Sequence, residues 1–256
     1  MASVTLILTI ISGLIIGLSL GLLGAGGAIL TVPALIYVVG MTEKAAIAHS
    51  LIVVGVIALA GTLFHLRRGQ RQLIPRVFSL FAISSIPGAA FGAWIGAVIP
   101  SYWQVSVLVV LMTLAAYKMM TPSVSADADE LRPVRLLAVG LATGALTGLV
   151  GVGGGFLIVP ALVMFAGLTM AQATATSLAL IVTNTSMAVL TLLLFDSSAE
   201  WQSTVLITLC SLGIAGVIAG RFLSGRVPVN VIRRVFAFCL LIIATVLSID
   251  TLTQLL

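Results

Sequence analysis

The feature that most constrains this chain is an internal duplication. The stretch GLLGAGGAILTVPAL at residues 21–35 returns as GLVGVGGGFLIVPAL at residues 148–162, an offset of 127 residues. Further matches are Ala48 to Leu51 with Ala175 to Leu178 and, at an offset of 128, Gly88, Gly92 and Pro100 with Gly216, Gly220 and Pro228. An ordered series of this kind indicates two homologous halves.

Each half divides into apolar segments that are typical of membrane helices. The segments lie near 4–23, 28–40, 44–66, 73–98 and 102–120, and near 135–150, 155–168, 172–195, 202–224 and 232–252. Hydrophobic residues make up 61% of the chain and charged residues 7%, against about 25% charged residues in soluble domains. These features predict an all-α polytopic membrane protein. The apolar first segment lacks the basic flank of a signal peptide, so we expect it to be a retained membrane segment and not a cleaved one.

The pattern also predicts the division of the chain. We expect an N-terminal transmembrane repeat over 1–120, a linker over 121–135 and a C-terminal transmembrane repeat over 136–256. The second segment of each half has about 13 residues. As a helix it would span about 20 Å, less than the roughly 30 Å of a bilayer core, so it is either a half-helix or a short span in a thinned region.

Charge in the short loops predicts that the halves cross the membrane in opposite directions. Four arginines flank the loop after the third segment of the first half, whereas its counterpart carries Asp196 and Glu200. The next loop reverses this, with no charge around Pro100 and four arginines around Pro228. Because positive loops stay in the cytoplasm, the repeats are inverted. This topology places 11 of the 12 bases in the cytoplasm of a bacterial inner-membrane protein, with both termini in the periplasm.

Glycines between the first and second segments predict broken helices that could bind an anion. Glycine allows backbone angles closed to other residues, and a helix that restarts inside a membrane protein presents unpaired backbone N–H groups. The alternative is that these glycines only permit close helix packing. The candidate residues are Gly24, Gly26, Gly27 and Ala28 in the first half, and Gly151, Gly153, Gly154 and Gly155 in the second. Pro33 and Pro160 are candidate hinges, or tolerated kinks.

Polar residues in the third segments complete the candidate site. His49 and Ser50 correspond to Thr176 and Ser177 by the repeat, and Asn184 lies two turns beyond Ser177 on the same helix face. In a membrane such groups must find partners or line a wet cavity. We therefore expect them to bind substrate, with interhelical bonding as the alternative. His49 could also carry a coupled proton, although a satisfied core histidine is the simpler interpretation.

Several function classes are disfavoured. The net charge of +5 is explained by loop arginines and forms no basic stripe with aromatics, so we expect no nucleic-acid partner. The two histidines lack an intramembrane carboxylate, and no catalytic or zinc motif is present. We expect no enzymatic activity, no metal and no cofactor, and we expect Cys210 and Cys239 to be apolar packing residues.

The twin glycine-rich motifs at 21–35 and 148–162, with the His-Ser-Leu and Thr-Ser-Leu sites at 49–51 and 176–178, resemble the sulfite exporter TauE/SafE family. The resemblance covers roughly residues 10–252. It implies a membrane permease for sulfite, sulfonates or related small anions. We expect a secondary transporter that binds its anion near the midplane between the repeats. The alternatives are an anion channel and a non-transporting biogenesis factor.

Overall fold

The computed structural model describes residues 2–23, 26–67, 72–120, 133–195, 201–223 and 229–255, and within them it is helical with no strands. The first half holds α1 (Ala2–Leu23), α2 (Thr31–Ala34), α3 (Glu43–Arg67), α4 (Pro75–Val98) and α5 (Ser101–Met120). The second half holds α6 (Pro133–Val150), α7 (Gly155–Ala166), α8 (Met170–Phe195), α9 (Ser203–Leu223) and α10 (Val229–Leu255). The predicted all-α class and the ten predicted segments are confirmed; α6 begins inside the predicted linker because Pro133 suits a first helical position.

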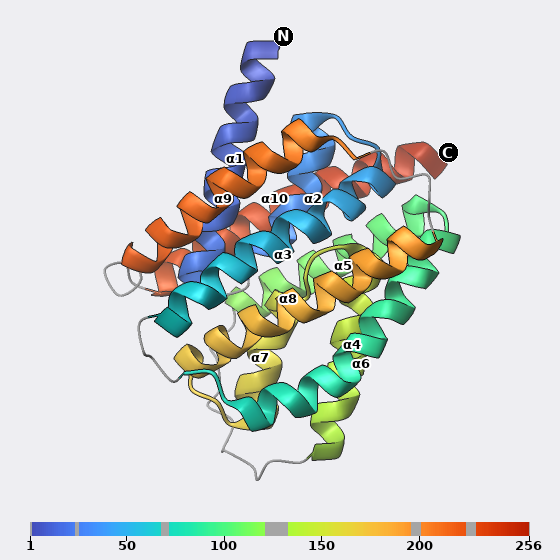
Figure 1. Ribbon diagram of the computed structural model, residues 1–256. Helices are drawn as coiled ribbons and strands as arrows, with labels where there is room; N and C mark the ends of the chain where they lie inside the picture. The colour runs from blue at the N-terminus through green and yellow to red at the C-terminus, as the bar shows by residue number, and fades with distance from the viewer. Residues whose placement is uncertain are drawn as a thin grey trace.

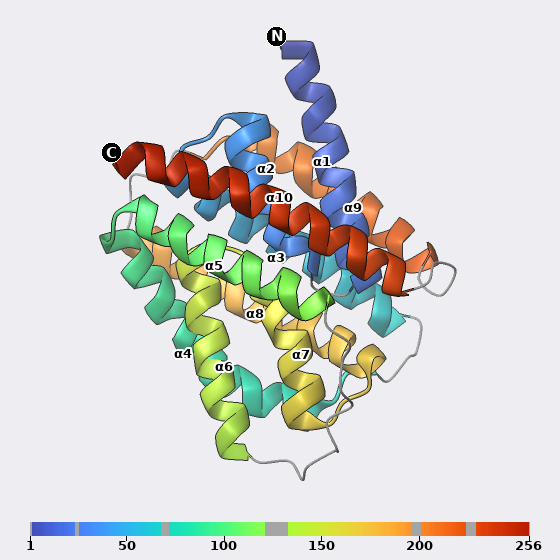
Figure 2. The same ribbon diagram turned by 180° about the vertical axis from the view of Figure 1, so that it is seen from behind.

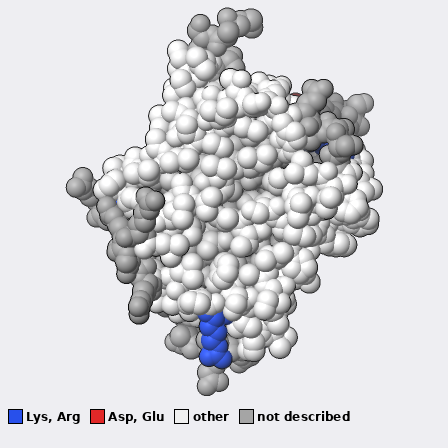
Figure 3. All heavy atoms as spheres, viewed as in Figure 1, with Lys and Arg blue, Asp and Glu red and all other residues white. Residues whose placement is uncertain are grey.

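The described helices have the length and the surface of a membrane protein. Five of them, α3, α4, α6, α8 and α9, are long and apolar enough to cross a bilayer, and shorter apolar helices accompany them. Large apolar side chains point outward, with Val98 70% and Ile207 69% exposed. One face of the molecule is almost free of charged atoms (Figure 3). Such a surface is stable against lipid, not against water.

The helices of the two halves interleave, and their contacts come in equivalent pairs. Helix α4 packs on α6 and, equivalently, α9 packs on α1. Helix α4 also packs on α8, as α9 does on α3, while α3 meets α8 and α5 meets α10. Figure 1 shows α3 and α8 next to each other on one face, and Figure 2 shows α5 and α10 next to each other on the opposite face. Each first helix is thus held by the fourth helix of the other half.

Glycines bring these crossing helices into backbone contact. A Cβ on Gly92 of α4 would overlap the carbonyl group of Ala145 in α6. At the equivalent crossing, a Cβ on Gly220 of α9 would overlap the carbonyl oxygen of Leu18 in α1 at 2.5 Å. Small residues are a common means of close approach in membranes, where lipid gives no hydrophobic drive to association. The small-residue pattern in the fourth helices therefore serves packing.

The short second segments end at equivalent glycines. In the first half a 3₁₀ turn (η1, Gly26–Leu30), α2 and a π turn (η2, Leu35–Val39) end at Gly40, whose φ is 80°. In the second half the 12-residue α7 ends at Gly167, whose φ is 63°. Left-handed glycine is a common helix stop because it has no Cβ to clash. At 1.5 Å per residue α7 is about 18 Å long, so this segment is shorter than a bilayer core.

Candidate functional site

The best-defined break in the fold is a buried glycine turn between α6 and α7. Gly151, Gly153 and Gly154 have φ values of 74°, 68° and 64°, in the left-handed region. All residues from Gly151 to Gly155 are buried, and no side chain caps the first turn of α7. A side-chain Cβ would be strained at these angles, which explains the glycine run. The turn lets α7 begin inside the protein with its N-terminal end facing the interior.

Three helices surround this turn. An added Cβ on Gly151 would meet Ile47 of α3 at 2.7 Å, and one on Gly153 would meet Val54 of α3 at 2.6 Å and Ile181 of α8 at 3.2 Å. An added Cβ on Gly154 would overlap the Thr147 hydroxyl of α6. The turn therefore lies where α3 of the first half meets α6 and α8 of the second.

Ser50 connects α3 to the glycine turn. Its hydroxyl lies within hydrogen-bonding distance of the Gly151 carbonyl and 2.8 Å from the Ile47 carbonyl, and the side chain is fully buried. The equivalent Ser177 donates to the Thr174 carbonyl at 2.9 Å and is also fully buried. Gly24, the counterpart of Gly151, lies outside the described residues. The structure thus brings Ser50 and the second glycine motif together across the two halves.

His49 and Thr176 make equivalent contacts despite their different chemistry. His49 Nδ1 lies 2.7 Å from the Ala45 carbonyl, so Nδ1 carries the proton, and Nε2 accepts from the Gln202 backbone N–H at 3.0 Å. Thr176 Oγ1 accepts from the Ile74 backbone N–H at 3.4 Å. Ile74 and Gln202 directly precede α4 and α9. In both halves a third-helix side chain therefore accepts a hydrogen bond from the start of the other half's fourth helix.

Asn184 has a different kind of environment. It is fully buried in α8, and its Oδ1 accepts a hydrogen bond from the Ser85 hydroxyl of α4 at 2.9 Å. Its Nδ2 has no hydrogen-bond partner among the described residues. A buried unsatisfied amide is costly, and such exceptions in a folded protein call for a specific explanation.

The first glycine motif packs closely against α1. An added Cβ on Gly27 would lie 2.6 Å from both the Ile16 carbonyl oxygen and the Leu20 backbone nitrogen of α1. Ala28 is fully buried, and Gly26 starts the 3₁₀ turn η1. Contacts as close as these also surround Gly153 in the second motif, so they do not by themselves separate packing from anion binding. The role of the first motif in binding an anion stays a prediction.

The two prolines lie inside the short helical segments. Pro33 is buried within α2, the helix that directly precedes the π turn, and Pro160 lies in the middle of α7. Each lacks the N–H that would complete a helical hydrogen bond. Their proposed hinge role stays a prediction.

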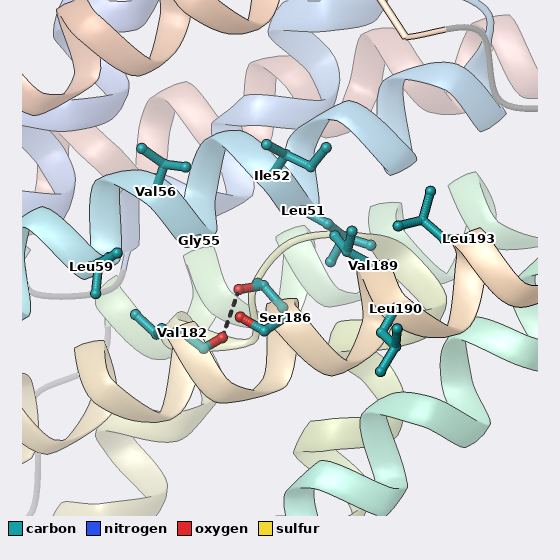
Figure 4. A pocket seen from close by; sticks show the side chains of 11 residues that line it. Leu51, Ile52, Gly55, Val56, Leu59, Val182, Ser186, Val189, Leu190 and Leu193 are labelled. Carbon is teal, nitrogen blue, oxygen red and sulfur yellow. Dashed lines mark hydrogen bonds between the residues drawn. The ribbon is translucent and has the colours of Figure 1, made fainter.

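A groove of about 370 Å³ runs between α3 and α8. Its walls come from Leu51, Ile52, Gly55, Val56 and Leu59 of α3 and from Val182, Thr185, Ser186, Val189, Leu190 and Leu193 of α8. Figure 4 shows Ser186 among valine and leucine side chains between the two helices. None of the predicted polar site residues is part of this lining. A wall with so few donors suits an anion poorly, so the buried polar residues of α3 and α8 are better candidates.

Sequence reasoning missed three parts of this arrangement. Ser85 was not singled out, because a serine in an apolar helix gives no signal until its partner Asn184 is known. The roles of the Ile74 and Gln202 backbone groups are equally invisible in side-chain patterns.

Within the described part of the chain, no group of three or more His, Cys, Asp or Glu residues could hold a metal ion.

Comparison with known proteins identifies the family. The model of the family described as sulfite exporter TauE/SafE matches residues 9–247. The chain belongs to this family. Two Xylella fastidiosa proteins named "Probable membrane transporter protein" are similar to it, at 39% identity (strain Temecula1) and 37% identity (strain 9a5c), each over 166 residues. A Bacillus subtilis protein named "Probable membrane transporter protein YunE" is 31% identical over 100 residues, 39% of this chain and 34% of the relative.

The similarity to the curated relatives is partial. For both Xylella proteins it covers 62% of this chain and 63% of the relative's length. Family membership and the apolar helices together establish a multi-pass membrane protein of a transporter family. The TauE/SafE match spans both glycine motifs and all the predicted polar residues.

Proposed function

We propose that this TauE/SafE protein is a secondary transporter for sulfite or a related small sulfur-containing or organic anion, bound near the membrane midplane between the two halves. The observation that carries the proposal is the buried glycine turn at 151–154, whose Gly151 carbonyl lies within hydrogen-bonding distance of the Ser50 hydroxyl. This turn joins the N-terminal end of α7 in one half to Ser50 of α3 in the other half. Asn184 lies about one helical turn along α8 from Ile181, the α8 residue next to Gly153. Broken helices that present their N-terminal ends to a central site are a recurrent transporter design.

The charge pattern supports an anion as substrate. No Asp or Glu lies between Lys44 and Tyr117 or between Leu136 and Phe195, so α3, α4, α6, α7 and α8 offer no carboxylate to a cation in their membrane-spanning parts. The buried polar side chains of these helices are hydroxyls, the Asn184 amide and two histidines. Hydroxyls, amides and backbone N–H groups hydrogen-bond anions without a full positive charge. A singly charged anion leaving a negative cell gains about 2.3 kcal/mol per 100 mV, so export without a coupled ion is energetically reasonable.

The contacts support the inverted topology that the loop charges predict. Tyr37 donates to Asp250 at 3.3 Å, Lys44 donates to the Ala97 carbonyl at 3.0 Å, and Gln202 donates to His49. All these residues belong to the predicted periplasmic ends. Arg221 donates to His65 at 3.2 Å at the predicted cytoplasmic ends. The proposal places the basic loops in the cytoplasm and both termini in the periplasm of the inner membrane.

The test is uptake into sealed proteoliposomes of labelled sulfite, thiosulfate, sulfate and methanesulfonate, under a set membrane potential. We expect saturable uptake of at least one of these anions, with strong loss in the double variant Ser50→Ala, Ser177→Ala. Thr113→Val is the control, because the Thr113 hydroxyl is exposed and, within the described part of the chain, donates only to the Val109 carbonyl of its own helix. Folded wild-type protein that moves none of these anions would overturn the proposed function.

A further inference from the structure

The Asn184–Ser85 pair has no polar counterpart in the other half. Asn184 corresponds to Ile57 at the offset of 127, and Ser85 corresponds to Gly213 at the offset of 128. The correspondence is also spatial, because an added Cβ on Gly213 would overlap the side chain of Ile57. One interface thus holds an amide and a hydroxyl where the equivalent interface holds an isoleucine and a glycine.

Packing alone does not account for this polar pair. The isoleucine and glycine show that an apolar pair fits the same helix crossing. The amide instead leaves its Nδ2 unpartnered in a side chain that is fully buried. The Ser85 hydroxyl bonds Oδ1 and thereby fixes the orientation of the amide, so that both Nδ2 hydrogens remain available.

The position of the pair is suited to a transported ligand. Asn184 lies near the middle of α8, and Ser85 lies near the middle of α4. Ile181 lies one helical turn before Asn184, and an added Cβ on Gly153 of the glycine turn would lie 3.2 Å from it. The amide is therefore about one turn along α8 from the break that begins α7.

Resting on the proposed function, we propose that the Asn184 Nδ2 donates to the transported anion, that Ser85 positions this amide, and that the site selects anions with a single negative charge. Suitable anions are alkylsulfonates and hydrogensulfite, whereas sulfate and the sulfite dianion are poor substrates. The site is single and belongs to the α4–α8 interface, not to both halves equally.

The selectivity follows from the absence of charge around the amide. The stretches 45–66, 77–117 and 136–195, which contain the membrane-spanning parts of α3, α4, α6, α7 and α8, hold no Lys, Arg, Asp or Glu. The cost of dehydrating an ion grows with the square of its charge, so a dianion costs about fourfold more than a monoanion of the same size. The electrostatic attraction of the ion to neutral hydrogen-bond donors only doubles from the monoanion to the dianion. A site without a cation therefore favours the monoanion.

The experiment compares variants that lose the same hydrogen bond. Asn184→Leu removes both the amide donor and the bond to Ser85, whereas Ser85→Ala removes only that bond. We expect Asn184→Leu to lower kcat/KM for labelled methanesulfonate by about tenfold or more, and Ser85→Ala to raise KM by only a few-fold. Thr191→Val is the matched control, since the buried Thr191 hydroxyl donates to the Met187 carbonyl of its own helix, with no other partner among the described residues. If the Asn184→Leu protein does not fold, Asn184→Ala is measured in its place.

A purely structural role for Asn184 predicts equal effects of Asn184→Leu and Ser85→Ala on flux, and that result would overturn the assignment.

The charge rule, that the site selects anions with a single negative charge, is tested by competition between anions and by the pH dependence of uptake. We expect excess sulfate to inhibit methanesulfonate uptake far less than ethanesulfonate does. We also expect sulfite uptake to fall as hydrogensulfite deprotonates through the neutral range while methanesulfonate uptake stays constant.

Equal inhibition by sulfate and ethanesulfonate, or sulfite uptake that rises with pH relative to methanesulfonate uptake, would overturn the charge rule. Wild-type protein that moves no anion would instead overturn the proposed function itself. The two failures are therefore distinguishable.

Discussion

His49 Nε2 accepts a hydrogen bond from the backbone N–H of Gln202 at 3.0 Å, and this bond joins α3 of one half to the start of α9 in the other. Nδ1 bonds the Ala45 carbonyl, and the ring packs on Trp201 with centroids 5.3 Å apart. Both ring nitrogens are therefore engaged when the ring is neutral. A second proton would have to replace the Gln202 contact.

We predict that His49 stabilises the fold and carries no coupled proton. His49→Ala should lower the free energy of unfolding in detergent by about 1–3 kcal/mol, because a donor loses its acceptor and an aromatic contact is lost. His49→Gln should respond to an imposed pH gradient in the proteoliposome assay as the wild type does. A folded His49→Gln protein that no longer responds to a gradient that drives the wild type would contradict this role.

The glycine crossings should be sensitive to a single methyl group. Gly92→Ala places a Cβ onto the backbone of Ala145, where neither helix can yield without separating. Overpacking of this kind typically costs about 1–3 kcal/mol, measured here as the change in the free energy of unfolding in detergent. Gly40→Asn is the control: Gly40 has a φ of 80° but nothing within 4 Å of an added Cβ. Since asparagine tolerates left-handed angles, an equal loss in both variants would show that packing is not the cause at Gly92.

The helices could be predicted well from the sequence, because membrane helices are long apolar runs and because the duplication repeats these runs in the second half. Apolar runs separated by charged or glycine-rich loops predicted all ten helical segments to within a few residues. The partners of the polar residues could not be predicted. Ser50 with Gly151 and Asn184 with Ser85 join residues about 100 positions apart, and a repeat alignment alone does not say which helices touch.

The asymmetry between the halves was harder still to interpret. The repeat pairs His49 with Thr176, and the histidine raised the option of a coupled proton that a threonine cannot carry. The structure shows that both accept a backbone N–H from an equivalent position. A more informative difference between the halves is that Asn184 corresponds to Ile57. Its meaning becomes clear only from the contacts of Asn184 with α4 and of Ile57 with α9.

The glycine turn should tolerate no side chain at Gly154. Its φ of 64° strains any L-residue by about 1–2 kcal/mol, and a Cβ would also overlap the Thr147 hydroxyl. We expect Gly154→Ala to destabilise the protein, and the double variant with Thr147→Ala to recover the steric part while the backbone strain remains. A double-mutant cycle measured by unfolding in detergent gives this coupling. Strict additivity of the two substitutions would contradict the overlap.

Cysteine accessibility should separate the predicted sides of the membrane. In a background with Cys210 and Cys239 replaced by alanine, we expect Ser101→Cys and Gln202→Cys to react with a membrane-impermeant thiol reagent from the periplasm. Arg76→Cys and Arg135→Cys should react only from the cytoplasm, because their loops carry the positive charges. Labelling of positions 101 and 202 from opposite sides would contradict the inverted arrangement.

The central claim is that one anion site between the two halves is exposed to each side in turn. Counterflow tests it most directly, with proteoliposomes preloaded with unlabelled methanesulfonate and then exposed to labelled methanesulfonate outside. A carrier predicts faster entry of label than into empty vesicles and a transient overshoot of label above its external concentration. Entry that rises linearly with concentration and ignores the internal anion would contradict the carrier and indicate an open pore.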